Sequence, residues 1–166
     1  MRADAGMPLW VDPDVHVAEC QRFDSYVVEG PKAEDCDFFT GAIGEDGYGR
    51  FFIYRGGTGI CVRPHRYALA RWLTVPLGPD ELGLHECDMP LCVKVCAPGA
   101  VRQHVVVGSQ CDNMRRMARM RRGGGRTAIP SDGLQACRDR SVVLRERGWN
   151  RAAVEAAVLG GIPTLR

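Results

Sequence analysis

Residues 83–92 read GLHECDMPLC and place one histidine and two cysteines within ten positions. Cys87 and Cys92 flank a short loop that contains Pro90, and a loop of this length can wrap around a metal ion. Tetrahedral zinc takes four thiolate or imidazole ligands, often as one close pair joined by residues from elsewhere in the chain. The stretch therefore predicts a metal site whose remaining ligands are distant in sequence, with His85 beside it as a candidate for chemistry.

Two further ligands have to come from other segments. Upstream, Cys36 lies in a short run without clear helical or strand alternation. Downstream, the candidates are Cys96, which follows Cys92 closely in a loop, and His104, which opens the apolar run VVV. Both downstream candidates stay open at this point. The simpler interpretation of the cysteine pair is two buried thiols that bind no metal.

The compartment bears on the choice between metal ligation and disulfide bonding. The chain has eight cysteines and no apolar run of about 18 residues or more. Residues 1–16 lack the basic start and apolar stretch of a signal peptide. These features predict a cytoplasmic protein with no membrane partner. Thiols seldom pair in a reducing compartment, so metal ligation is the better explanation for clustered cysteines.

Charge is distributed unevenly along the chain. The net charge is +2, but residues 1–49 hold 11 acidic and 3 basic side chains, whereas residues 50–166 hold 9 acidic and 19 basic ones. Nearly all the basic residues are arginines, whose guanidinium suits bidentate contact with phosphate. A basic body behind an acidic leader favours a polyanionic partner, with a solvated charged surface as the simpler explanation.

The 166 residues fit one domain with appendages, and their pattern predicts mixed α and β structure. We expect a short helix near residues 17–28, a hairpin or small sheet over residues 35–65, a helix over residues 65–74 and a strand over residues 104–108. Ser109 has the position of an N-cap for a helix over residues 110–122. Residues 123–133, GGGRTAIPSDG, are predicted to be a flexible linker, followed by helical segments over residues 134–148 and 149–161.

Ordered motifs between about residues 36 and 122 resemble a known family. DCDFFTG, GYGRF, PHR-x-A, LHECDMPLC, HVVVGSQ and CDNMRRM follow the order of a phage-type HNH endonuclease. That family belongs to the ββα-metal (His-Me finger) nucleases and is similar in layout to the His-Cys box homing endonucleases. The resemblance implies an α+β fold, a small zinc-stabilised ββα-metal (HNH) finger domain with an N-terminal hairpin or sheet and a helical C-terminal tail. It divides the chain into an acidic N-terminal extension (1–35), an HNH nuclease domain (36–126), and a linker with a helical tail (127–166).

Carried onto this chain, the structural zinc (Zn²⁺) of the family falls on four residues, Cys36, Cys87, Cys92 and His104. The family usually places its fourth ligand shortly after the close pair, with Asn-Pro between them. Here the longer segment VKVCAPGAVRQ separates Cys92 from His104, and the Asn-Pro is missing. We interpret this departure as an enlarged loop, because HVVVGSQ still follows in family style. Cys96 remains the alternative ligand.

The resemblance also implies the chemistry. His85 is the expected general base, which takes a proton from the water that attacks a DNA phosphate. Asn113 is the expected ligand of a catalytic divalent cation, Mg²⁺ or Mn²⁺, which stabilises the leaving 3′-oxygen. The products would carry 5′-phosphate and 3′-hydroxyl ends. Without the motifs, a structural histidine and a capping asparagine are the simpler interpretations of these two residues.

Five arginines are candidates for DNA contact: Arg115, Arg119, Arg122, Arg50 and Arg66. The first three share one face of the predicted helix and could follow a phosphate backbone. Arg50 and Arg66 are weaker candidates, since a structural arginine between hairpin and helix explains them equally well. His65 is expected to pack in the core, and it is the next candidate for the base after His85.

The sequence thus predicts a phage or mobile-element DNA endonuclease that depends on a divalent cation and is held together by zinc. One rival is a zinc-stabilised DNA-binding or packaging accessory module that cleaves weakly or not at all. A second rival is a structural zinc protein whose basic helix binds a protein partner. The C-terminal tail is a candidate surface for a homodimer.

Overall fold

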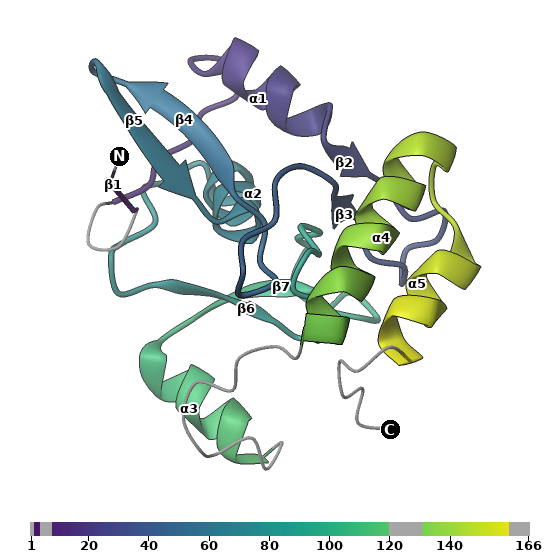
Figure 1. Cartoon of the computed structure of the whole chain (residues 1–166). Helices are drawn as coiled ribbons and strands as arrows, with labels where there is room; N and C mark the ends of the chain where they lie inside the picture. The colour runs from purple at the N-terminus through teal and green to yellow at the C-terminus, as the bar shows by residue number, and fades with distance from the viewer. Residues whose placement is uncertain (1, 4–7, 120–130, 160–166) are drawn as a thin grey trace.

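The computed structural model describes residues 2–3, 8–119 and 131–159 (Figure 1). The helices are α1 (Val17–Asp24), α2 (Pro64–Leu73), α3 (Gln110–Arg119), α4 (Ser131–Arg147) and α5 (Arg151–Leu159). The strands are β1 (Arg2–Ala3), β2 (Val27–Val28), β3 (Phe38–Phe39), β4 (Phe51–Arg55), β5 (Thr58–Val62), β6 (Leu82–His85) and β7 (Val105–Gly108). Within the described residues, these strands form three small sheets, β1-β5-β4, β2-β3 and β6-β7. The predicted α+β class is confirmed at this level.

The β4–β5 hairpin follows from alternation and from its turn. Along β4, Phe51 and Ile53 are buried while Phe52 and Tyr54 face solvent. The turn residues 56 and 57 are glycines with φ of 54° and 75°, the conformation that tight hairpin turns require. The buried face packs on α2, which begins at Pro64, and the helix predicted over residues 65–74 is confirmed within one residue.

The main core contains residues of α1, of the β4–β5 hairpin, of α2 and of the N-terminal segment before α1. The ring of Phe23 in α1 lies tilted against Tyr67 of α2 with ring centroids 4.6 Å apart, and it meets Phe51 edge-on at 5.2 Å. Leu9 and Val11 are buried in the same cluster. Residues from the acidic N-terminal segment therefore belong to the core that supports the hairpin.

The helix predicted near residues 17–28 is shorter than expected. α1 ends at Asp24, and the next valines form β2, which pairs antiparallel with β3 through Val27–Phe39 and Val28–Phe38. β-branched side chains favour this extended pairing over a further helical turn. The pairing holds the segment around Cys36 against the rest of the molecule.

The β6–β7 hairpin leads directly into α3. β6 and β7 are antiparallel, with His85 opposite Val105, and α2 packs against both strands. α3 extends away from the main body in Figure 1. The strand predicted over residues 104–108 is confirmed from residue 105 onward.

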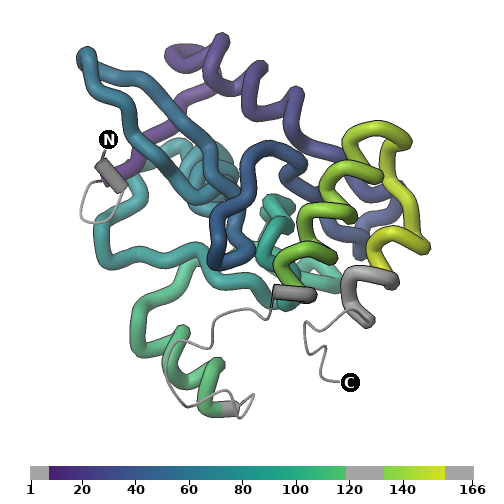
Figure 2. The backbone as a smooth tube through the Cα atoms, in the orientation of Figure 1, coloured from purple at the N-terminus to yellow at the C-terminus, as the bar shows by residue number. Residues whose placement is uncertain are grey.

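The C-terminal helices α4 and α5 pack on each other beside β3, as the tube in Figure 2 also shows. α4 begins at Ser131, so the prediction of a linker through residue 133 is wrong for its last three residues. Residues 123–130 of that predicted linker lie outside the described part of the chain. No described helix is both long and apolar enough to cross a membrane.

Candidate metal centre and active site

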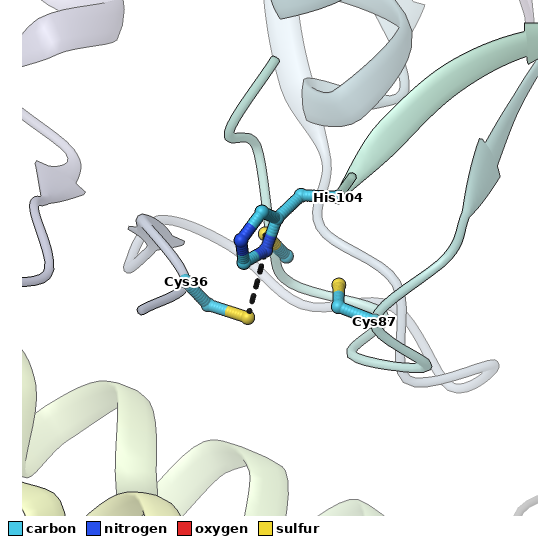
Figure 3. A group of neighbouring side chains, drawn as sticks. Cys36, Cys87 and His104 are labelled. Carbon is cyan, nitrogen blue, oxygen red and sulfur yellow. Dashed lines mark hydrogen bonds between the residues drawn. The ribbon is translucent and has the colours of Figure 1, made fainter. Parts of the chain in front are cut away.

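Four buried side chains from distant segments converge on one point: Cys36, Cys87, Cys92 and His104. Their ligand atoms all lie within 4.8 Å of one another. Figure 3 shows Cys36, Cys87 and His104 turned toward a common centre, with Cys36 hydrogen-bonded to the imidazole. This buried set of three thiols and one imidazole can hold a metal ion such as zinc, as the motifs implied.

The cysteine loop owes its shape to a backbone reversal after β6. Asp88 adopts a left-handed conformation with φ of 59°, which an aspartate tolerates better than most side chains. The chain then turns so that Cys92 N donates to Met89 O over 3.0 Å. This reversal brings the thiols of Cys87 and Cys92 to the same point, with the four residues between them forming the loop.

Two backbone hydrogen bonds bring the distant ligands to this loop. Val93 N donates to Asp37 O over 2.8 Å, which joins the cysteine pair to the segment that carries Cys36. Glu86 N donates to His104 O over 2.6 Å, which places the histidine beside the same loop. The backbone thus positions all four ligands.

The donor set fits tetrahedral zinc. Usual zinc–sulfur and zinc–nitrogen bond lengths place two sulfur ligands about 3.8 Å apart and a sulfur about 3.6 Å from a nitrogen. The Nδ1 atom of His104 lies 3.4 Å from Cys36 Sγ and 3.6 Å from Cys92 Sγ. Nδ1 is therefore the ligand atom that the ring presents. The other nitrogen, Nε2, is buried without a hydrogen-bond partner in the described part of the chain.

Hydrogen bonding among the three thiols separates their pKa values. The hydrogen bond with Cys87 is the main cause that raises the pKa of Cys36 to about 12. Burial, and then hydrogen bonding to the other two thiols, raises the pKa of Cys92. Hydrogen bonds from Cys36 and Cys92 lower the pKa of Cys87. Metal ligation requires all three sulfurs as thiolates, so binding of a dication would release the protons that these thiols still carry.

The longer segment between Cys92 and His104 does not supply the fourth ligand. Cys96 is half-buried and lies outside the ligand cluster found among the described residues. The segment folds back through a parallel bridge between Val95 and Val105. It therefore returns the chain to the start of β7, so His104 reaches the cysteines, and the alternative of Cys96 is not supported.

His85, the last residue of β6, lies beside the metal cluster but is not part of it. Its Nε2 hydrogen-bonds to Cys92 O over 3.0 Å. A carbonyl can only accept, so Nε2 carries the proton and Nδ1 keeps a lone pair in the neutral ring. Nδ1 has no hydrogen-bond partner among residues 8–119 and 131–159. Burial lowers the pKa of His85, which favours the neutral ring.

His65 supports His85 from the neighbouring helix. The two rings meet edge-on with centroids 4.5 Å apart, and Tyr48 lies 5.7 Å from His65 and 6.1 Å from His85. β6 can approach this closely because residue 83 is glycine: an added Cβ would lie 2.8 Å from the Cδ2 atom of His65. Burial, followed by His85, lowers the pKa of His65. The position of His65 supports the expected packing role.

Asn113 lies in the first turn of α3, directly after β7. Ser109 caps this helix: its hydroxyl accepts from Asp112 N over 3.2 Å, and Asp112 accepts from Ser109 N over 2.9 Å. The predicted N-cap is confirmed. Asn113 is half-buried, and its side chain has no hydrogen-bond partner within the described ranges, which leaves its amide oxygen available to a ligand.

Arg116, which the sequence did not single out, connects α3 to the cysteine loop. Its guanidinium lies 2.5 Å from a carboxylate oxygen of Glu86 and 3.1 Å from one of Asp88, and its side chain is only 13% exposed. The signal that could have identified it is the pair of acidic residues on either side of Cys87. Arg116 therefore holds the helix of Asn113 against the loop of the metal ligands.

Of the three arginines proposed for DNA contact on α3, the structure describes the side chain of Arg115 alone. Arg115 has a 74% exposed side chain, and its one ion pair among the described residues is a long contact of 3.8 Å with Asp112. Such a surface pair contributes little, so the guanidinium can reach a phosphate. Arg119 ends α3, but its side chain and the whole of Arg122 lie outside what the structure describes.

The two arginines of the hairpin region have structural partners. Arg50 forms an ion pair of 2.9 Å with Asp46. Arg66 is buried and donates to Gly78 O over 2.8 Å and to Glu81 O over 2.5 Å. The contacts of Arg66 fix the segment that leads into β6, whereas the ion pair of Arg50 lies within the loop before β4. Both sets of contacts favour the structural role over DNA contact.

α4 covers the metal centre, a role that the sequence analysis missed. Cys137 and Leu144 of α4 are buried in one cluster with the cysteine ligands and with Phe38 and Leu91. Arg140, which lies between them on the helix, is 2% exposed. Burial lowers the pKa of Arg140, and interaction with the sulfurs of Cys137, Cys36 and Cys92 opposes this effect.

No protein-family model, curated protein or solved structure matches this chain, so its function has to be inferred from the site itself.

Proposed function

We propose that this chain is a metal-dependent DNA endonuclease of the HNH type, which hydrolyses phosphodiester bonds. The observation that carries the proposal is the hydrogen bond of His85. Because Nε2–H is donated to Cys92 O, the Nδ1 lone pair of the neutral ring is left to accept a proton from water. The lowered pKa of His85 keeps that lone pair available near neutral pH.

The order of the elements supports this assignment. Two antiparallel strands, β6 and β7, are followed at once by α3. His85 ends the first strand, and Asn113 lies in the first helical turn. This is the order that the resemblance to ββα-metal nucleases implies for the general base and the cation ligand.

The metal centre would serve as a scaffold for the base. Cys92 offers its sulfur to the metal cluster and its carbonyl oxygen to His85. A zinc ion held by Cys36, Cys87, Cys92 and His104 would fix the loop and, through that carbonyl, the tautomer and orientation of the imidazole.

The catalytic cation and the DNA would be held by α3. The Asn113 amide oxygen is a hard ligand suited to Mg²⁺ or Mn²⁺. A cation bound there would stabilise the negative charge that develops on the leaving 3′-oxygen. The exposed Arg115, two positions further along, would contact the phosphate backbone.

A second candidate is a zinc-stabilised DNA-binding module with little or no cleavage. One observation favours it: in the described part of the chain, the Cys36, Cys87, Cys92 and His104 cluster is the only group of three or more candidate metal ligands. The nuclease proposal accommodates this, because Mg²⁺ keeps most of its ligands as water and substrate oxygens and needs few protein groups.

Cleavage of supercoiled plasmid in Mg²⁺ or Mn²⁺ tests the proposal. We expect nicked or linear products from the wild type and a rate at least about a hundredfold lower from His85→Ala, the usual scale for a lost general base. His16→Ala is the matched control, because His16 precedes α1, hydrogen-bonds to Asp12 and lies outside the metal cluster. Zinc content and DNA retention should be the same in all three proteins. A wild type that binds zinc and DNA but leaves the plasmid intact would establish the second candidate instead.

A further inference from the structure

Arg140 is a buried cation without a carboxylate partner among the described residues. Its Nη2 lies 3.7 Å from Cys137 Sγ and its Nη1 lies 3.8 Å from Met89 Sδ, while its Nε has no partner there. The guanidinium carbon lies 5.0 Å from the centroid of the Phe38 ring. Thiol and thioether sulfurs are weak acceptors, so these contacts do not replace the water that the charge has lost.

Such burial is costly unless an anion is close. Removing an unpaired charge from water is unfavourable even after the protein has relaxed, and an arginine cannot avoid this penalty by losing its proton. A partner of opposite charge is therefore expected within the same buried cluster.

A metal-loaded centre would supply that opposite charge. Cys137 and Leu144, on either side of Arg140 along α4, pack in one buried cluster with Cys36, Cys87 and Cys92. A divalent ion bound by three thiolates and one neutral imidazole carries a net charge of −1. Arg140 carries +1, so the ligands, the ion and the guanidinium together are neutral. Charges of opposite sign attract strongly in such a weakly polarisable interior.

We propose that Arg140 is the counter-ion of the metal centre, and that metal loading and the docking of α4 are therefore thermodynamically linked. The guanidinium stabilises the anionic three-thiolate complex, and the complex in turn stabilises the buried guanidinium. The coupling is reciprocal: the free energy by which docked α4 strengthens metal binding equals the free energy by which the metal strengthens α4 docking. This inference does not depend on nuclease activity.

The first test measures zinc affinity by competition with a chelator. Arg140→Met removes the charge at similar length, and Arg138→Met makes the same change at an exposed position on the same helix. We expect Arg140→Met to weaken zinc binding by about tenfold or more, the scale seen when groups that support metal ligands are lost. Arg138→Met should bind zinc as the wild type does. Equal affinities in Arg140→Met and the wild type would overturn the proposal.

A second variant separates charge from shape and covers the case in which Arg140→Met fails to fold. Arg140→Lys keeps the positive charge but loses the planar fork, so its zinc affinity should stay within a few-fold of the wild type. An Arg140→Lys protein that folds but binds zinc at least tenfold more weakly than the wild type would show that charge is not the cause.

Hydrogen exchange of the wild type tests the linkage directly. Removal of zinc with a chelator should accelerate amide exchange across residues 137–144 of α4. α1 packs in the separate core cluster of Phe23 and Tyr67, so its exchange should change less. If residues 137–144 exchange equally slowly with and without zinc, α4 docks independently of the metal and the proposal is wrong.

Discussion

Replacement of one metal ligand should disrupt the layer around the metal centre. Cys92 is fully buried, and three features depend on it: the metal cluster, the bridge to Phe38 and the carbonyl that accepts from His85. Cys92→Ser retains the backbone and nearly the same size but removes one thiolate. Its effect therefore measures the metal contribution more than a packing defect.

The expected magnitude follows from the ligand set. Structural zinc in small domains contributes an apparent binding free energy of about 10–16 kcal/mol at neutral pH. The total stability of a small domain is about 5–15 kcal/mol. Loss of metal binding would thus remove as much free energy as holds the whole domain folded, so we expect the layer formed by the cysteine loop and α4 to unfold at 25 °C.

Cys137→Ser is the matched control, because Cys137 is also fully buried in the same cluster and is not a metal ligand. Burying its hydroxyl should cost about 1–3 kcal/mol. Zinc content and urea denaturation check both variants. Cys137→Ser should keep one zinc per chain, whereas Cys92→Ser should lose it and should already have the layer of the cysteine loop and α4 unfolded without urea. The reasoning is refuted if Cys92→Ser unfolds at the same urea concentration as the wild type.

Three further predictions concern catalysis, acid stability and DNA binding. Asn113→Ala should lower the cleavage rate and raise the Mg²⁺ concentration required for cleavage, with unchanged DNA affinity, because a cation on the leaving oxygen acts mainly in the transition state. Cleavage titrated with Mg²⁺ checks this prediction. Unchanged cleavage would mean that α3 is not part of the active site. Burial alone would raise the pKa of Asp46, but hydrogen bonds from Arg63 and Arg50 hold this pKa well below 3.8. The stability that the carboxylate contributes is therefore present above about pH 4 and is lost as the pH falls further. Urea denaturation should show that Asp46→Asn loses less stability than the wild type below pH 4. Arg115→Ala should weaken binding to any DNA sequence and reduce the salt dependence by about one phosphate contact, and an unchanged salt slope would mean that Arg115 only faces solvent.

The sequence was most informative where local rules apply. The close pair Cys87 and Cys92 predicts a metal site from spacing and ligand chemistry, and the structure brings Cys36 and His104 to it. Ser109 was identifiable as a cap because an N-cap depends only on the following turn. The choice between Cys96 and His104 could not be made from spacing, since it depends on how the intervening loop folds back along β7.

The covering of the metal centre could not be predicted from sequence. Arg140 resembles the other arginines of α4, such as Arg138, and only tertiary packing makes one of them buried and the other exposed. Arg116 was missed for the same reason, because its partners Glu86 and Asp88 come from a loop 28 or more positions away. Helical periodicity identifies which residues share a face, but it does not identify what that face contacts.

X-ray absorption at the zinc edge, on protein purified without chelators, is the most direct measurement of the central claim that a Cys₃His zinc centre organises this site. The account predicts one zinc per chain with three sulfur ligands at about 2.3 Å and one nitrogen ligand at about 2.0–2.1 Å. Protein without zinc, or zinc surrounded by four sulfur atoms or mainly by oxygen atoms, would contradict it.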